Sequence, residues 1–388
     1  MSTARHDPTG RRETAARRLS RRSFVVRAAG LTVASTTLPA LLSACGSDDE
    51  PPEGGGGAEA FKVGFVYLGP PGDAGWTFQH DQSRKHLEQT VPNVEALVIE
   101  NVPEANAGPA LDQLISQGCK LIFATSFGYG DAVLRRAQQH RDVMFEHCSG
   151  IEQAENVATY YGKHWDPMWV IGFAAGKLSQ TGRLGFVGSF PIPDVKVDAN
   201  AFTLGARAAN PEATTQVILI NSWYDPPKEK QAARTLIEAG ADVLSGVEDS
   251  PSILQEAANH PGVLSATWNS DMSKFAPEAF VSAVVFDWRS YVVKRTKEAM
   301  DGTWESHDFW GDVNDGTVAL APWGDPVPDD LQATLDKRFE AVESGSLEAF
   351  AGPLTDAGGK ERVPGGGELS FEEVLGMNWY VEGVKASG

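Results

Sequence analysis

From Phe61 onward, short apolar runs alternate with longer amphipathic stretches. This alternation constrains the fold strongly, because strands that each feed a helix pair in parallel and are covered by helices on both faces. The runs predicted to be strands are 62–68, 95–99, 121–125, 143–147, 183–187, 215–220, 242–245, 262–266 and 281–286. The stretches predicted to be helices include 76–89, 108–117, 131–140, 166–179, 228–239 and 288–300. The sequence therefore predicts an α/β fold built on parallel sheets.

These strands are too many for one sheet of usual width, and the helical segment around Trp165 to Leu178 falls midway between them. We therefore expect two α/β lobes. Residues 61–180 form the first, completed by about 287–325, and residues 181–286 form the second, completed by about 326–388. In such sheets ligands bind outside the carboxyl ends of the strands, so paired lobes predict a ligand cleft between two such edges.

The start of the chain has the pattern of an export signal. Arg21 and Arg22 precede an apolar run that ends at Leu42-Ser43-Ala44-Cys45. The pattern predicts a twin-arginine signal peptide over residues 1–44, with lipidation of Cys45 and a flexible Gly- and acid-rich tether over 45–60. A membrane-spanning helix is the alternative, but the run is interrupted by Arg27 and is shorter than the roughly 20 residues that a span needs.

Charge and cysteine content exclude two further classes of protein. The chain has 33 basic and 52 acidic residues, of which eight Arg and two acids fall in residues 1–44, so 25 basic face 50 acidic residues in the remainder. A body this acidic repels phosphate backbones, which excludes nucleic-acid binding. Three Cys are too few for a disulfide framework. Cys119 and Cys148 lie at opposite ends of neighbouring predicted strands, so both are expected to be free thiols.

Aromatic and acidic side chains follow several of the predicted strands. Trp76, Phe127 and Trp223 come after strands of the two lobes, and Asp249 and Asp271 follow two later ones. Each Trp alone is more often a packing residue, and each Asp alone is as often a helix cap or turn residue. Together they suit a flat, uncharged heterocycle, because aromatic faces stack on rings and carboxylates accept hydrogen bonds from N–H groups.

The sequence does not match the known motifs for cofactor binding, metal binding or catalysis. The spacing of the glycines in residues 69–75 departs from the dinucleotide-binding pattern. The segment 172–177 is one residue short of a phosphate-binding loop. Because this segment lies in a helical pattern, a close contact between helices is the better interpretation of its glycines. His140 and His147 have no Cys or carboxylate at metal-ligand spacing. No Gly-x-Ser-x-Gly elbow occurs. We expect no cofactor, no metal and no enzymatic activity.

Several segments resemble a known family. They are 64–66, 72–77, 124–128 and 186–189, together with 67–73, 221–226, 270–277 and 377–383. The chain resembles the basic membrane protein family of substrate-binding lipoproteins of ABC importers, and most strongly its purine-binding branch. The resemblance implies a type I periplasmic-binding-protein fold, in which two Rossmann-like lobes are joined by three crossings. It also implies stacking by Trp76, Phe127 and Trp223 and polar contacts from Asp249 and Asp271.

The expected function is that of a monomeric receptor, lipid-anchored on the outer face of the cell membrane, that captures a purine base or nucleoside for an ABC permease. Many nucleoside-binding members have Phe-Asn where this chain has Trp76-Thr77, which leaves free base and nucleoside both open. A ligand-sensing lipoprotein of the same fold is one alternative. An exported nucleoside hydrolase is another, although its Asp-rich metal loop has no counterpart here.

Overall fold

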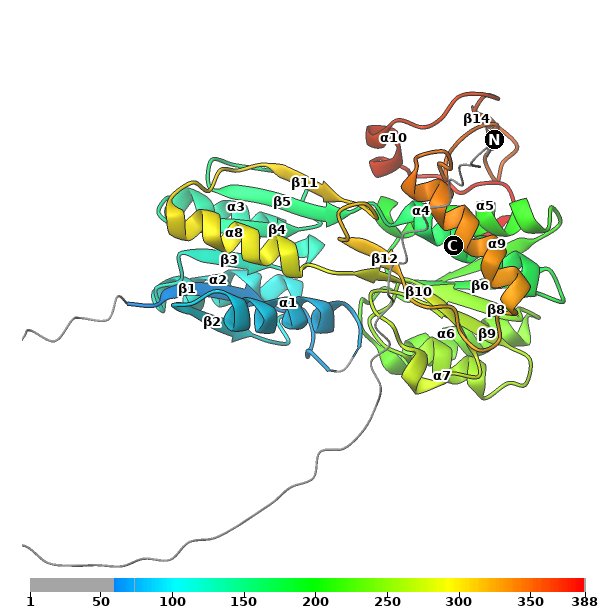
Figure 1. The fold of residues 1–388 in the computed structure, drawn as a ribbon, viewed down its shortest axis with the longest axis horizontal. Coiled ribbons are helices and arrows are strands. Elements are labelled where there is room, and N and C mark those ends of the chain that lie inside the picture. Colours follow the sequence, from blue (N-terminus) through cyan, green and yellow to red (C-terminus); the bar gives the residue numbers. More distant parts are fainter. Residues whose placement is uncertain (1–58, 73, 387–388) are drawn as a thin grey trace, which may run out of the picture. The chain divides into compact units, whose positions relative to one another are not determined.

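The computed structural model describes residues 59–72 and 74–386, and their first sheet has the strand order β11-β5-β4-β3-β1-β2 (Figure 1). Its strands are β1 (Phe61–Val66), β2 (Val94–Ile99), β3 (Leu121–Ala124), β4 (Met144–Cys148), β5 (Val157–Gly162) and β11 (Asp308–Gly311). All neighbouring strands pair in parallel. We call this sheet and its helices the first lobe.

Side chains of the first sheet alternate between two cores, as a sheet covered on both faces requires. Val63 and Phe65 of β1 belong to one core cluster, whereas Val66 belongs to the other. Helices α1 (Trp76–Thr90) and α8 (Arg289–Asp301) pack together against one face, and α2 (Ala107–Ser116) and α3 (Gly130–Gln139) against the other (Figure 1). The buried strands are therefore apolar on both faces, which explains their continuous apolar runs.

The second sheet has the order β12-β10-β9-β8-β6-β7-β15, with β12 antiparallel to β10 and the other pairs parallel. Its strands are β6 (Arg183–Gly188), β7 (Thr214–Leu219), β8 (Val243–Gly246), β9 (Leu264–Thr267), β10 (Phe280–Phe286), β12 (Val318–Leu320) and β15 (Val384–Ala386). Its helices are α4 (Trp165–Leu178), α5 (Pro193–Ala209), α6 (Pro226–Glu238), α7 (Ser252–Ala258) and α9 (Asp329–Glu343). A C-terminal segment adds β13 (Leu354–Thr355), β14 (Glu361–Val363) and α10 (Phe371–Leu375). These elements form the second lobe.

Helices α4 and α5 approach each other closely because glycines lie at their contact. A Cβ atom on Gly172 would lie 2.0 Å from the carbonyl oxygen of Phe202, and one on Gly205 would lie 1.9 Å from that of Trp169. Backbone this close leaves no room for a side chain. The close helix contact predicted for residues 172–177 is therefore confirmed.

The chain passes between the lobes at three places, after β5, after β10 and after β11. The first crossing places α4 in the second lobe, where it packs on α5, so the first lobe ends near Gly162 rather than at residue 180. The third crossing places β12 in the second sheet, so the segment returning to the first lobe ends near Gly311 rather than at about 325. The α/β fold with two lobes is confirmed, and Cys119 and Cys148 are buried free thiols.

Candidate functional site

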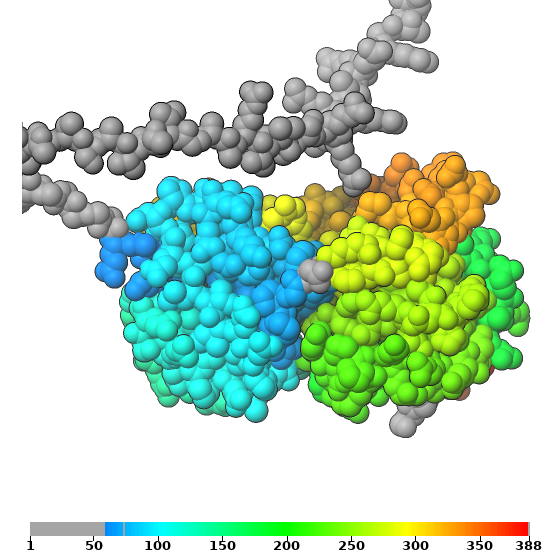
Figure 2. All heavy atoms as spheres, turned by 90° about the horizontal axis from the view of Figure 1, so that it is seen from below, coloured from blue at the N-terminus to red at the C-terminus, as the bar shows by residue number. Residues whose placement is uncertain are grey.

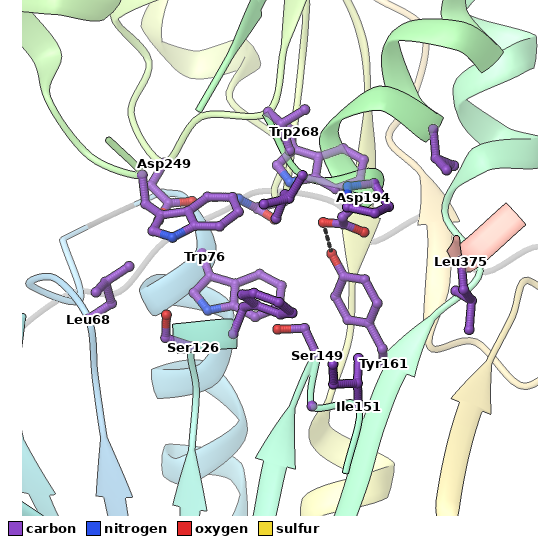
Figure 3. A pocket seen from close by; sticks show the side chains of 18 of the residues that line it. Leu68, Trp76, Ser126, Ser149, Ile151, Tyr161, Asp194, Asp249, Trp268 and Leu375 are labelled. Atoms are coloured by element: carbon purple, nitrogen blue, oxygen red, sulfur yellow. Dashed lines mark hydrogen bonds between the residues drawn. The ribbon is translucent and has the colours of Figure 1, made fainter. Parts of the chain in front are cut away.

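A cavity of about 300 Å³ lies between the lobes. Both lobes contribute to its lining, largely from loops that follow the strands, as Figure 3 shows for the labelled residues. The first lobe contributes Leu68, Trp76, Ser126, Phe127, Ser149, Gly150, Ile151 and Tyr161. The second lobe contributes Trp165, Ile192, Pro193, Asp194, Val197, Trp223, Val247, Asp249, Trp268, Asn269 and Leu375, and Trp310 lies in strand β11 of the first lobe. The surfaces of the first lobe, blue and cyan, and of the second, green and yellow, meet in Figure 2.

Trp76 begins α1 and is held in one orientation. Its indole N–H donates to the carbonyl oxygen of Thr125 at 2.6 Å, and its ring makes edge contacts with Phe286 at 5.7 Å and Tyr161 at 6.0 Å. Because the N–H group is bonded to backbone, the indole offers the cavity an apolar surface rather than a donor. Its position is consistent with the predicted stacking role.

Trp223 follows β7 and joins the two lobes. Its indole N–H donates to Glu104 of the first lobe at 3.3 Å, and its ring lies 5.2 Å from that of Phe190. Phe127 follows β3 and is 40% exposed at the cavity, where Ile151 is 79% exposed. Exposed apolar side chains around a cavity are typical of a binding site rather than of packing.

Asp249 lines the cavity and connects the lobes. Its carboxylate accepts a hydrogen bond from the side-chain amide of Asn269 at 2.8 Å and one from the backbone N–H of Trp76. Burial, together with the nearby charge of Glu229, raises the pKa of Asp249 well above its ordinary value. The first-lobe chain also passes very close, since a Cβ atom on Gly75 would lie 2.2 Å from the Asp249 carbonyl oxygen.

Among the predicted ligand-binding residues, all of which the structure describes, Asp271 is the one that does not line the cavity. It is exposed, and its carboxylate accepts the backbone N–H of Ser273 at 2.8 Å, which is a turn interaction. Asn269, two residues earlier, lines the cavity instead. Its side-chain oxygen is buried without a hydrogen-bond partner in the described part of the chain, and its φ of 69° is a conformation that non-glycine residues rarely adopt.

A buried charged group that was not predicted from the sequence lies at the first crossing. His164 is fully buried between two carboxylates, with Nδ1 2.7 Å from Asp198 and Nε2 2.9 Å from Asp194. Burial lowers the pKa of His164, but the two carboxylates outweigh it and raise the value to about 10. His164 is therefore an imidazolium whose two N–H groups both donate.

Asp194 connects this group to the cavity. It lies in the first turn of α5 and lines the cavity, and its second oxygen accepts the Tyr161 hydroxyl at 3.1 Å across the lobes (Figure 3). Trp268 packs edge-on against the His164 ring at 5.0 Å. Trp268 and Asn269 come shortly after the predicted strand 262–266. Tyr161 lies in strand β5 and Asp194 in the first turn of helix α5, and the sequence pattern predicted neither element.

Further contacts hold the lobes together around the cavity. The backbone N–H of Gly75 donates to Ser270 at 2.9 Å, and the side chain of Gln79 donates to the carbonyl oxygens of Phe286 at 2.6 Å and Asn269 at 3.1 Å. All of these bonds run from the first lobe to the second. Residues beside the cavity therefore connect the two lobes directly.

Residues 59–72 and 74–386 contain no cluster of three or more His, Cys, Asp or Glu that could hold a metal ion. Within the same ranges no helix is long and apolar enough to cross a membrane. Residues 1–44 and Cys45, to which the export and lipidation predictions refer, lie outside the described residues.

Two α/β lobes with a mostly apolar cavity between them, at the carboxyl ends of their strands, define a solute-binding protein of the type I periplasmic-binding fold. A solute-binding protein of an ABC transporter from Aeropyrum pernix matches this fold, with a TM-score of 0.65 over 76% of this chain and 94% of its own, at 15% identity.

The family model described as ABC transporter substrate-binding protein, PnrA-like, matches residues 60–346. The chain is 41% identical to a purine-binding protein of Brucella abortus over 84% of this chain and 93% of the relative. It is 32% identical to a putative ABC transporter glucose-binding protein of Haloferax volcanii over 84% and 81%. The chain belongs to the Bmp family of PnrA-like ABC transporter substrate-binding proteins.

Proposed function

We propose that this protein captures a purine base or nucleoside outside the cytoplasm and delivers it to an ABC permease, without any catalytic step. The observation that carries the proposal is the set of aromatic side chains that both lobes bring to one cavity, Trp76 and Phe127 from the first and Trp223 from the second. A flat ring between such faces gains about 1–3 kcal/mol per stacked contact. The likeness to a purine-binding relative supports this ligand class.

The lining also argues against a sugar, which the name of the second relative raises. A hexose carries several hydroxyl groups, and each one buried without a partner costs about 1–3 kcal/mol. Several side-chain donors of the cavity already have partners in the protein: the indole N–H groups of Trp76, Trp223 and Trp310 and the hydroxyls of Ser126 and Ser149. A purine suits these walls better, because its two flat faces carry no hydroxyl groups and its polar groups are confined to the ring edge.

Phosphorylated ligands are disfavoured for a related reason. The described lining contains the carboxyl groups of Asp194 and Asp249 and no Lys or Arg. Behind Asp249, Glu229 and Glu248 are buried, and burial raises the pKa of both carboxyl groups. A phosphate would therefore enter a site of buried carboxyl groups that offers it no cationic donor.

Native mass spectrometry of the protein as purified tests the proposal, together with thermal melting in the presence of candidate ligands. Adenine, guanine, hypoxanthine or their nucleosides are expected to raise the melting temperature, because a ligand that binds only the folded state stabilises it. The corresponding nucleotides and glucose serve as controls and are expected to leave it unchanged. Stabilisation by glucose and by no purine or nucleoside would overturn the proposal.

Export and anchoring through Cys45 are part of the same proposal and rest on the sequence motif at 42–45 and on Arg21 and Arg22. Cys45→Ala is expected to release the protein from the membrane fraction, because a bacterial lipoprotein is held by two or more acyl chains. Exchanging both arginines for lysine is expected to block export. Unchanged export of that variant would argue against the twin-arginine route and leave the lipidation claim standing.

A further inference from the structure

One end of the cavity combines a single strong acceptor with apolar walls. Figure 3 places Tyr161, Asp194 and Leu375 at the end opposite Leu68 and Asp249. The other cavity residues that α5 and its preceding residue contribute are Ile192, Pro193 and Val197. Asp194 is therefore the group from this helix that can make a hydrogen bond to a ligand.

The Asp194 carboxylate is held in place from three directions. One oxygen accepts from the His164 imidazolium at 2.9 Å and the other from Tyr161 at 3.1 Å, and the N-terminus of α5 favours its negative charge. His164 is fixed in turn by Asp198 at 2.7 Å, and Asp198 is fully buried. A carboxylate has about four lone-pair sites, so two partners leave capacity for a third donor. The side chain is 26% exposed, in contrast to His164 at 1%.

Such a group can accept either one N–H of a heterocycle or the hydroxyls of a ribose. A ribose placed here would bring several hydroxyls against Ile192, Val197 and Leu375, with Asp194 as their main partner. The unpaired hydroxyls would lose their hydration without compensation. One ring N–H leaves no such group unpaired, so the surroundings of Asp194 favour a ligand without a sugar.

We propose that the ligand is a free purine base that donates the N–H of its five-membered ring to Asp194, at the nitrogen where a nucleoside carries its ribose, and that His164 is the positioning residue for this contact. This inference rests on the proposed function and selects between the two ligand classes that it leaves open. Adenine and hypoxanthine satisfy the contact, whereas adenosine, inosine and 9-methyladenine lack the N–H.

Isothermal titration of the wild-type protein with adenine, 9-methyladenine and adenosine tests the inference without any variant. A hydrogen bond to a charged group corresponds to roughly a 10- to 150-fold change in affinity. Adenine is therefore expected to bind at least about tenfold more tightly than either derivative. Equal affinity for adenine and the two derivatives would overturn the inference while leaving the proposed function intact. Absence of binding by any purine or nucleoside would overturn both.

Substitution of Asp194 separates the hydrogen bond from simple exclusion of the methyl group. In Asp194→Asn the preference for adenine over 9-methyladenine is expected to shrink to a few-fold, since the charged acceptor is gone. A preference that persists unchanged would mean that the cavity excludes the methyl group by size, and the inference would fail. Asp194→Glu keeps the charge but displaces the carboxylate, so it should narrow the preference as well.

The role of His164 has its own readout. His164→Gln is expected to reduce the ratio of the affinities for adenine and 9-methyladenine, because the Asp194 carboxylate loses its charged partner. If His164 had a purely structural role, the substitution would change the melting temperature and leave this ratio unchanged. Asp271→Asn is the matched control, since Asp271 is an exposed aspartate outside the cavity lining. In Asp271→Asn the ratio of the affinities for adenine and 9-methyladenine should equal that of the wild type. A ratio altered as much as in Asp194→Asn would refute the assignment of the contact to Asp194.

Discussion

Replacing Trp223 by alanine distinguishes a stacking role from a packing role. Trp223 is partly buried at the cavity and makes one inter-lobe hydrogen bond, to Glu104 at 3.3 Å. Loss of one stacked ring costs about 1–3 kcal/mol, and loss of the hydrogen bond adds about 1 kcal/mol. We expect purine affinity to fall by about 2–4 kcal/mol, roughly 30-fold to nearly 1,000-fold in Kd, measured by isothermal titration. The melting temperature of the ligand-free protein should change little.

Two further variants make this prediction sharper. Trp223→Phe keeps an aromatic face but loses the bond to Glu104, so its affinity should fall only about fivefold. Tyr224→Ala is the control, because the neighbouring Tyr224 is 45% exposed and is not among the residues lining the cavity. If Trp223→Ala bound the purine as tightly as the wild type and instead lost about 3–5 kcal/mol of folding stability, Trp223 would be a core residue and the stacking argument would be refuted.

Three other substitutions follow from the same structure. Gly75→Ala, which places a Cβ atom 2.2 Å from the Asp249 carbonyl oxygen at a φ of 93°, should oppose closure and weaken ligand binding by about 2 kcal/mol or more, read by titration. Because the pKa of His164 is raised to about 10, its contribution to stability is complete below about pH 6.5 and is lost as the pH rises toward 10. His164→Gln should remove this slope from unfolding free energies measured over that range, and an unchanged slope would argue against a charged His164. Gly205→Ala, with its Cβ 1.9 Å from the Trp169 carbonyl oxygen, should cost about 1–3 kcal/mol of stability by calorimetry and leave the affinity of the folded protein unchanged.

The strands with continuous apolar runs could be predicted from the sequence. Strand β5 could not, and its sequence shows why. Strand β5 is entirely buried, yet its sequence VATYYG mixes small, hydroxyl-bearing and aromatic residues. Two of its polar groups have partners in distant segments: the Thr159 hydroxyl donates to Asp308 of β11 at 2.7 Å, and the Tyr161 hydroxyl donates to Asp194 at 3.1 Å. A partner 149 residues away leaves no local periodic signal. Missing β5 also concealed Tyr161 and moved the expected lobe boundary to residue 180.

Helix α5 escaped prediction for a similar reason. Its buried face includes Asp198 and Asn200, which interrupt the apolar pattern of an amphipathic helix. Asp198 is paired with His164, and Asn200 accepts the backbone N–H of Val381 at 3.0 Å and donates to the carbonyl oxygen of Trp379 at 2.9 Å. The burial of Asp198 and Asn200 can be understood only when their hydrogen-bond partners are known. Asp194, in the first turn of this helix, was therefore outside any sequence-based list of site residues.

Asp271 shows the limit of placing side chains by their distance from a strand end. Strand β9 ends at Thr267, and the following Trp268 and Asn269 already line the cavity. The positive φ of Asn269 turns the chain, so that Asp271 is exposed at a turn. A carboxylate that looks suited to ligand binding in the sequence is thus used locally, while an amide two residues earlier presents its unpartnered oxygen in the cavity lining.

Binding and lobe closure are linked through the residues that contact both the cavity and the other lobe. Asp249 lines the cavity and accepts the backbone N–H of Trp76 at the start of α1, while Tyr161 lines it and donates to Asp194. Neither lobe alone provides the aromatic faces of both Trp76 and Trp223, so the proposed stacking contacts require both lobes. A ligand that contacts both lobes must then favour closure by the difference between its affinities for the closed and open states. The same hydrogen bonds that fix the cavity walls therefore set the apparent affinity, because any change that weakens closure lowers the fraction of protein competent to bind.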